Sequence, residues 1–238
     1  MSTQPFTFKQ FSVNQDKCAM KIGTDGVLLG AWATVKDNPF AILDIGAGTG
    51  IIALMLAQRS QAEVIDAIEI DDSAYEQCVD NFELSPWGDR LFCYHAGLDE
   101  FVDEIEDKYD LIISNPPFFT ENYKTNDTAR NTARFQDALP YNHLIESSSK
   151  LLEVNGKFVV IIPYKEKKDF INIAAQHKLY PNKILDIKGT ASSPFKRSLI
   201  EFSFRESDIE TNTLTIELER HLYTKDYIDL TKDFYLKM

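Results

Sequence analysis

The segment Asn115-Pro116-Pro117-Phe118 is the part of the sequence whose residue types point most directly to chemistry. It follows the apolar run Leu111-Ile112-Ile113-Ser114, which is typical of a buried strand, so it should lie at the carboxyl end of that strand. Two adjacent prolines donate no backbone hydrogen bond, fix their own φ angles and restrict the residue before them. We therefore expect a stiff loop that presents the Asn115 side chain and the Pro116 carbonyl.

Such a loop suits methyl transfer to a planar exocyclic nitrogen, whose lone pair is delocalised into a ring or a carbonyl group. Hydrogen bonds from the amine protons to the Asn115 side-chain oxygen and the Pro116 carbonyl would draw the nitrogen toward tetrahedral geometry and free its lone pair. Phe118 would stack on the flat face of the substrate. Taken alone, the tetrapeptide does not separate adenine, guanine and glutamine as acceptors, and a strand-ending turn without chemistry is a further alternative.

The loop Asp44-Ile45-Gly46-Ala47-Gly48-Thr49-Gly50 comes between a predicted strand over 40–44 and a predicted helix over 51–59. Ligands of open α/β sheets bind beyond the carboxyl ends of such strands. Dinucleotide enzymes space their glycines as G-x-G-x-x-G, whereas here the spacing is G-x-G-x-G. The acidic Asp44 also suits an ammonium and a sulfonium better than a pyrophosphate. The loop resembles the first motif of class I methyltransferases, which use S-adenosylmethionine; a tight glycine-rich turn without a ligand is the alternative.

Two more positions fit a nucleoside cofactor. Glu69 ends the next predicted strand and can accept hydrogen bonds from both ribose hydroxyls, which suits S-adenosylmethionine and NAD equally. Asp71 and Asp72 are expected to cap the following helix. The resemblance to methyltransferases implies that Gly97 and Leu98 border the adenine ring, although Gly97 stands where many members carry an acid.

Strand and helix patterns alternate along the chain, which predicts an α/β, Rossmann-like class I methyltransferase fold with a mostly parallel seven-stranded sheet and helices on both faces. Residues 1–238 are expected to form a single domain. We divide it into a covering segment (1–36), a core (37–205) and a C-terminal extension (206–238).

Three local expectations follow from the same patterns. Thr24-Asp25-Gly26 should open a short capped helix. Residues 183–188 and 198–204 should form a hairpin-like pair at one sheet edge. The polar stretch 118–138 should be a mobile loop that is poorly fixed without substrate.

The bulk composition narrows the class of protein. The net charge of −12 argues against a nucleic-acid partner, but residues 1–120 hold a balance of −13 and residues 121–238 a balance of +1. A basic patch could therefore form in the second half. The three cysteines and four histidines have no metal-ligand spacing, and no apolar run approaches the length of a membrane span. We expect a cytoplasmic, reduced, metal-free monomer that does not enter a membrane.

Beyond these motifs, the sequence resembles the bacterial tRNA1(Val) adenine-37 N6-methyltransferase family nearly from end to end. The resemblance rests on the tetrapeptide, the glycine loop, and the following segments: Phe8-Lys9-Gln10-Phe11, residues 18–32, Arg130, Ala133-Arg134 and residues 230–237. It implies methylation of the adenosine just 3′ of the anticodon in a valine tRNA. It also implies that Thr24 and Asp25 approach the methionine end of the cofactor.

The same resemblance requires basic side chains that hold RNA phosphates. The candidates are Lys124, Arg130, Arg134, Lys196 and Arg197. Family members tend to carry a histidine after the Ala-Arg pair, where this chain has Phe135. If that residue touches RNA, the contact differs here.

Competing functions use related chemistry. A glutamine N5-methyltransferase acting on a protein factor shares the Asn-Pro-Pro opening, but it should carry a separate N-terminal helical domain, and only about 39 residues precede the first strand here. A guanine N2-methyltransferase acting on ribosomal RNA is a second alternative. A non-enzymatic RNA-binding module is disfavoured because the cofactor loop and Asn115 are both intact.

Overall fold

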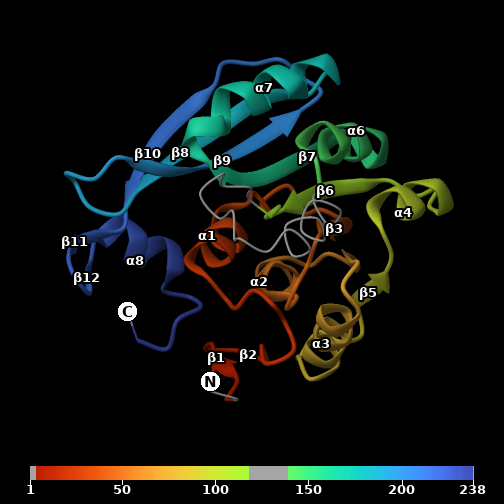
Figure 1. Ribbon diagram of the computed structural model, residues 1–238, viewed down its shortest axis with the longest axis horizontal. Coiled ribbons are helices and arrows are strands. Elements are labelled where there is room, and N and C mark those ends of the chain that lie inside the picture. Colours follow the sequence, from red (N-terminus) through yellow and green to blue (C-terminus); the bar gives the residue numbers. More distant parts are fainter. Residues whose placement is uncertain (1–3, 118–138, 238) are drawn as a thin grey trace, which may run out of the picture.

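The computed structural model describes residues 4–117 and 139–237, and within them one eight-stranded sheet organises the chain (Figure 1). The strand order is β10-β8-β9-β7-β6-β3-β4-β5. The strands are β3 (Ala41–Ile45), β4 (Val64–Glu69), β5 (Leu91–His95), β6 (Tyr109–Ser114), β7 (Leu152–Pro163), β8 (Tyr180–Lys188), β9 (Phe195–Ser203) and β10 (Glu210–Thr215). All pairings are parallel except those of β9 with β7 and with β8.

The expected count of seven strands was one too low. The additional strand is β10, which pairs in parallel with β8 at the sheet edge. The antiparallel pair β8–β9 was expected at the edge of the sheet, but β10 lies outside it, so the pair is one strand away from the edge. Only Leu214 of β10 is fully buried, so this edge strand has almost no apolar alternation in its sequence.

Helices cover both faces of the sheet. They are α1 (Thr24–Trp32), α2 (Ile51–Arg59), α3 (Asp72–Glu83), α4 (Leu98–Glu104), α6 (Tyr141–Leu151), α7 (Lys167–Gln176) and α8 (Lys225–Thr231), with a short 3₁₀ turn η2 (Tyr164–Glu166). Asp71 caps α3 by accepting a hydrogen bond from the Ala74 backbone N–H at 2.8 Å, as expected. The expected cap of α1 was wrong, because Thr24 is already helical and Gly23, at the cap position, has no side chain to cap with.

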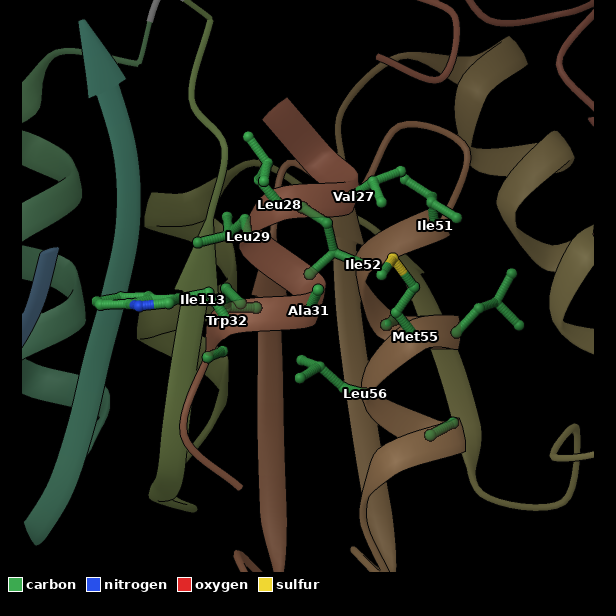
Figure 2. Packing of buried hydrophobic residues seen from close by; sticks show 14 of the residues in the cluster. Val27, Leu28, Leu29, Ala31, Trp32, Ile51, Ile52, Met55, Leu56 and Ile113 are labelled. Carbon is green, nitrogen blue, oxygen red and sulfur yellow. The ribbon is translucent and has the colours of Figure 1, made fainter. Parts of the chain in front are cut away.

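Two apolar clusters hold the layers together. One lies between the sheet and helices α1 to α3, where Figure 2 shows Val27 and Ala31 of α1 beside Ile51, Ile52 and Met55 of α2. The other lies beneath α4, α6 and α7 on the opposite face. Gly30 lets α1 approach α2 closely, because an added Cβ would lie 2.9 Å from the Met55 sulfur. Among the described residues, none of the helices combines the length and apolarity needed to cross a membrane.

The two ends of the described chain pack against each other. The N-terminal hairpin of β1 (Phe6–Thr7) and β2 (Ser12–Val13) lies beside the segment after α8, where the Lys9 backbone N–H donates to the Phe234 carbonyl at 2.8 Å. The small hairpin of β11 (Glu217–Glu219) and β12 (Leu222–Tyr223) precedes α8 on the same side of the molecule (Figure 1). Segments from both ends therefore form one wall beside α1.

Candidate active site

The glycine loop joins β3 to α2 at the carboxyl edge of the sheet. Gly46, Gly48 and Gly50 all have positive φ angles, of 74°, 56° and 77°. An added Cβ at Gly50 would lie 2.5 Å from the Phe82 ring, so this glycine is required by packing. At Gly46 and Gly48 an added Cβ would meet nothing within 4 Å, because both face open space at the sheet edge. The loop thus leaves room for a ligand to approach its backbone.

Glu69 ends β4 directly beside this loop. Its Oε2 accepts a hydrogen bond from the Gly48 backbone N–H at 2.8 Å, and its Oε1 accepts from the backbone N–H groups of Ile70 and Asp71 at 2.8 and 2.9 Å. These bonds fix the carboxylate in place. These bonds use three of the four lone pairs of the carboxylate, so Oε2 can accept one more hydrogen bond, from a ligand hydroxyl.

Asp44 lies beneath the loop and is fully buried. Its Oδ2 accepts from the Ala53 backbone N–H of α2 at 3.2 Å, while its Oδ1 has no hydrogen-bond partner among the described residues. Loss of solvation raises the pKa of the Asp44 carboxyl to about 7. Near neutral pH this group therefore exchanges between its acidic and ionised forms, unlike an ordinary surface aspartate.

This raised pKa predicts an unusual pH dependence of stability. Above a pH of about 4 Asp44 has lost its proton in the unfolded chain, whereas in the folded protein it keeps that proton up to a pH of about 7. The folded state therefore binds more protons between these pH values, and the contribution of Asp44 to the free energy of unfolding falls as the pH rises through that window. Between pH 4.5 and pH 7 the free energy of unfolding of the parent chain should fall relative to that of Asp44→Asn, which has no titrating group at this position. Urea unfolding at several pH values measures this difference, and a constant difference would contradict the assignment.

The end of β6 places Asn115 next to the glycine loop. Ser114 pairs with Ile45 of β3, and its buried hydroxyl donates to the Ile45 carbonyl at 2.9 Å. Asn115 follows at once, so it starts the loop adjacent to the one that begins at Gly46. Its Oδ1 is buried and has no hydrogen-bond partner among the described residues. An unsatisfied acceptor costs free energy unless a ligand supplies a donor, so this oxygen marks a binding position.

A cavity of about 760 Å³ opens along this edge of the sheet. Gly48, Glu69 and Gly97 line it from the three loops that follow β3, β4 and β5. The N-terminal segment closes the cavity through Cys18, Ala19 and Met20, and the Met20 side chain is 67% exposed there. These residues belong to the segment 1–36 that was predicted to cover the substrate or the cofactor, and this role stays a prediction.

The remaining predicted cofactor residues lie around this cavity and not in its walls. Leu98 begins α4 and is buried, and Gly46, Asp44 and Asn115 border the same edge of the sheet without lining the cavity. Thr24 lines a second cavity instead. Their proposed contacts with a cofactor therefore stay predictions.

An ion pair joins two residues that the sequence assigned to different ligands. The Arg197 Nε donates to the Asp25 carboxylate at 2.7 Å, so a predicted RNA contact and a predicted cofactor contact bind each other. Neighbouring Lys196 is exposed at the start of β9. The other predicted site residues, Phe118, Lys124, Arg130 and Arg134, and the expected loop 118–138 lie outside the described residues.

Comparison with known proteins identifies the family. The family model of the methyltransferase small domain matches residues 27–172. A tRNA1(Val) (adenine(37)-N6)-methyltransferase of Flavobacterium johnsoniae is 65% identical over 98% of this chain and all of its own length. Proteins of the same name from Bacteroides fragilis and Trichodesmium erythraeum are 48% and 46% identical over the full length of both chains. The chain belongs to this family. The resemblance stated from its sequence motifs is confirmed.

Solved structures agree with the fold of the family. A predicted O-methyltransferase from Agrobacterium tumefaciens superposes with a TM-score of 0.66 at 18% identity, covering 88% of this chain and 96% of the other. The ribosomal protein L11 methylase of Lactobacillus delbrueckii superposes with a TM-score of 0.55, also at 18% identity, over 80% and 84% of the two chains. The expected class of fold is therefore confirmed.

The residues of the edge cavity fit the S-adenosylmethionine that the fold implies. Gly46 and Gly48 leave space for the cofactor to contact the backbone of the glycine loop, and the Glu69 carboxylate can accept from a ribose hydroxyl of the cofactor. Buried, unpartnered oxygens of Asp44 and Asn115 flank the same edge and lack a donor among the described residues. Within residues 4–117 and 139–237 no three His, Cys, Asp or Glu side chains are grouped to hold a metal ion, and the metal-free expectation stays a prediction.

Proposed function

We propose that this chain transfers a methyl group from S-adenosylmethionine to N6 of adenine 37 in a valine tRNA. The observation that carries the reaction type is the buried Asn115 Oδ1 at the sheet edge beside the glycine loop, which has no donor among the residues that the structure describes. The choice of adenine 37 rests on the names of relatives that match over their whole length. The tetrapeptide alone fits guanine or glutamine equally well.

Asn115 and Pro116 hold the acceptor nitrogen. The Asn115 Oδ1 accepts a hydrogen bond from one amine proton and the Pro116 carbonyl accepts from the other, which turns the nitrogen lone pair out of the ring plane. When bound, the cofactor supplies an electrophilic methyl group on a sulfonium. No strong base is required, because the methylated amine is cationic and readily loses its proton. The chain therefore contributes position and fixed dipoles, and neither Asn115 nor Pro116 has to change its charge.

Glu69 and the glycine loop orient the cofactor. The backbone hydrogen bond from Gly48 to Glu69 locks the loop to the carboxylate that would hold the ribose. Gly97, at the start of α4, lies on the opposite side of the cavity, where the adenine ring of the cofactor would rest. A cofactor held by these residues would supply its methyl group to an acceptor bound at the loop after β6.

The RNA enters from the more basic half of the chain. Lys196 and Arg197 lie at the start of β9, which is the carboxyl edge of the sheet because β9 runs antiparallel to β7. An anticodon-loop base is already unpaired, so turning it into the site costs less than extracting a base from a duplex. Electrostatic attraction at this edge offsets the acidic net charge of the molecule.

Mass spectrometry tests the proposal. The purified protein is incubated with S-adenosylmethionine and unmodified total tRNA, and the RNA is digested to nucleosides and, separately, to mapped fragments. We expect N6-methyladenosine at position 37 of a valine tRNA. Parallel reactions with ribosomal RNA and with a protein lysate cover the two alternatives. Methyl groups found on guanine or on glutamine, with none on adenine in tRNA, would overturn the assignment.

A further inference from the structure

A second cavity of about 530 Å³ lies on the other side of the start of α1. Its walls carry four aromatic side chains, Phe6, Tyr223, Tyr227 and Tyr235, together with Glu217 and Lys237. The Tyr223 and Tyr227 rings lie 5.0 Å apart between their centroids, at 35° to each other. A volume of several hundred Å³ that combines aromatic rings with polar and charged side chains can hold one small planar ligand that also makes hydrogen bonds.

Every residue of these walls lies outside the part of the chain that matches the general methyltransferase model. The match covers residues 27–172, whereas the walls come from residues 6–24 and 189–237. The full-length relatives, in contrast, align through both of these segments. The cavity is thus built by the parts of the chain that distinguish this family from methyltransferases in general, which is where recognition of a particular substrate belongs.

The cavity lies close to the methyl-transfer site. Thr24 forms part of its wall, and the adjacent Asp25 is held by Arg197 of β9. Arg197 pairs with Pro163 of β7, and Val160 pairs with Ser114 of β6. With strands about 4.8 Å apart and a rise of about 3.3 Å per residue, the backbone of Arg197 lies on the order of 12 Å from that of Asn115. Because Arg197 contacts Asp25, the neighbour of Thr24 in the cavity wall, the nearer wall of the cavity lies on the Arg197 side of the methyl-transfer site, where a nucleotide next to the target adenosine in the RNA loop would lie.

The polar groups of the cavity suit a nucleobase better than a phosphate. Its one acid, Glu217, accepts a hydrogen bond from the His221 backbone N–H at 3.2 Å through Oε1, and its remaining lone pairs can accept from the N–H groups of a base. A phosphate would instead be repelled by this carboxylate. Lys237, at the rim, provides a single cation that suits the backbone of a nucleotide whose base lies inside.

We infer that this tyrosine-lined cavity binds a second unpaired base of the anticodon loop, near the adenosine that is methylated. The inference rests on the proposed function, since it assigns part of the same RNA to a site outside the methyl-transfer cavity. The bound base stacks on Tyr223 and donates to Glu217. In this way the C-terminal extension selects the RNA while the loop after β6 carries out the reaction.

The experiment compares Tyr223→Leu and Glu217→Gln with the parent protein. We expect the Kd for unmodified valine tRNA to rise at least about fivefold in each variant, because stacking and hydrogen bonding to the base are lost. The Kd for S-adenosylhomocysteine and the kcat at saturating tRNA should stay within about twofold. Tyr180→Leu is the matched control. Tyr180 lies at the amino end of β8, whereas the cavity lies at the carboxyl end of the same strand, so this variant should leave tRNA binding unchanged.

A set of tRNAs with one abasic position each in the anticodon loop identifies the base. One position should weaken binding to the parent protein but cause no additional loss in Tyr223→Leu, and this non-additivity supports the site. Additive losses at every position, or unchanged tRNA binding by both cavity variants, would overturn the inference while leaving adenine methylation in place. Absence of N6-methyladenosine with the parent protein would overturn the proposed function together with this inference.

Discussion

Replacing Asn115 with alanine should lower kcat for methyl transfer by roughly 10²- to 10³-fold, the usual cost of removing one preorganised polar group from a reacting centre. The physical reason is that the buried Asn115 Oδ1 has no hydrogen-bond partner among the described residues. It is therefore free to accept a hydrogen bond from an amine proton of the substrate, and the variant loses that bond. Single-turnover methylation of valine tRNA measures the rate. Binding of S-adenosylhomocysteine should change by less than about threefold.

Two further measurements separate a catalytic role from a structural one. Thermal unfolding of Asn115→Ala should stay close to that of the parent protein, because Ser114, and not Asn115, makes the hydrogen bond that ties β6 to β3. If cofactor binding falls as steeply as turnover, Asn115 supports the shape of the site and the proposed contact with the substrate amine is wrong.

Replacing Glu69 with alanine should weaken binding of S-adenosylhomocysteine by roughly 100-fold. The variant loses the hydrogen bond from a ribose hydroxyl to a charged group, at about 1.5–3 kcal/mol, and the backbone hydrogen bond that holds Gly48 in place. Isothermal titration calorimetry measures the affinity. Because Glu69 also accepts from Ile70 and Asp71, the free energy of unfolding should fall as well.

Glu69→Gln distinguishes the two roles of this side chain. Glutamine keeps the size and one acceptor oxygen but loses the charge, so the affinity should lie between those of the parent and the alanine variant. Glu63→Ala removes an exposed carboxylate just before the amino end of β4 and should leave the affinity unchanged. Equal affinities for the parent and both Glu69 variants would show that Glu69 neither binds the ribose nor organises the loop for cofactor binding.

Much of the core could be predicted because its elements have strong local patterns. The apolar runs that form β3, β4 and β6 are buried on both faces, and α2 follows its glycine loop at the residue expected. The strand β10 could not be predicted in this way, since five of its six residues are not fully buried and its register comes from pairing with β8. Alternation of apolar and polar residues arises where one face of a strand is buried, and few side chains of an edge strand are buried.

The site shows the same division. Glu69 and the glycine loop were assigned to one cofactor from separate motifs, and the Gly48–Glu69 hydrogen bond brings them together because neighbouring parallel strands end at one edge. Within the predicted covering segment 1–36 only Thr24 and Asp25 were named as site residues, whereas Cys18, Ala19 and Met20 line the cavity. That segment is held in place by the buried Gln77 of α3, which accepts from the backbone N–H groups of Lys17 and Cys18, and such a distant pairing leaves no pattern in the sequence.

The ion pair between Asp25 and Arg197 has a thermodynamic consequence. If a phosphate of the RNA draws Arg197 away, Asp25 at the start of α1 loses its partner and becomes available to the ammonium group of the cofactor. Linkage then requires that each ligand change the affinity of the other by the same factor. The total free energy of binding would be the same whichever ligand binds first, although the rates of the two routes could differ. The affinity for the cofactor would therefore change when tRNA is bound, and the affinity for tRNA would change when the cofactor is bound.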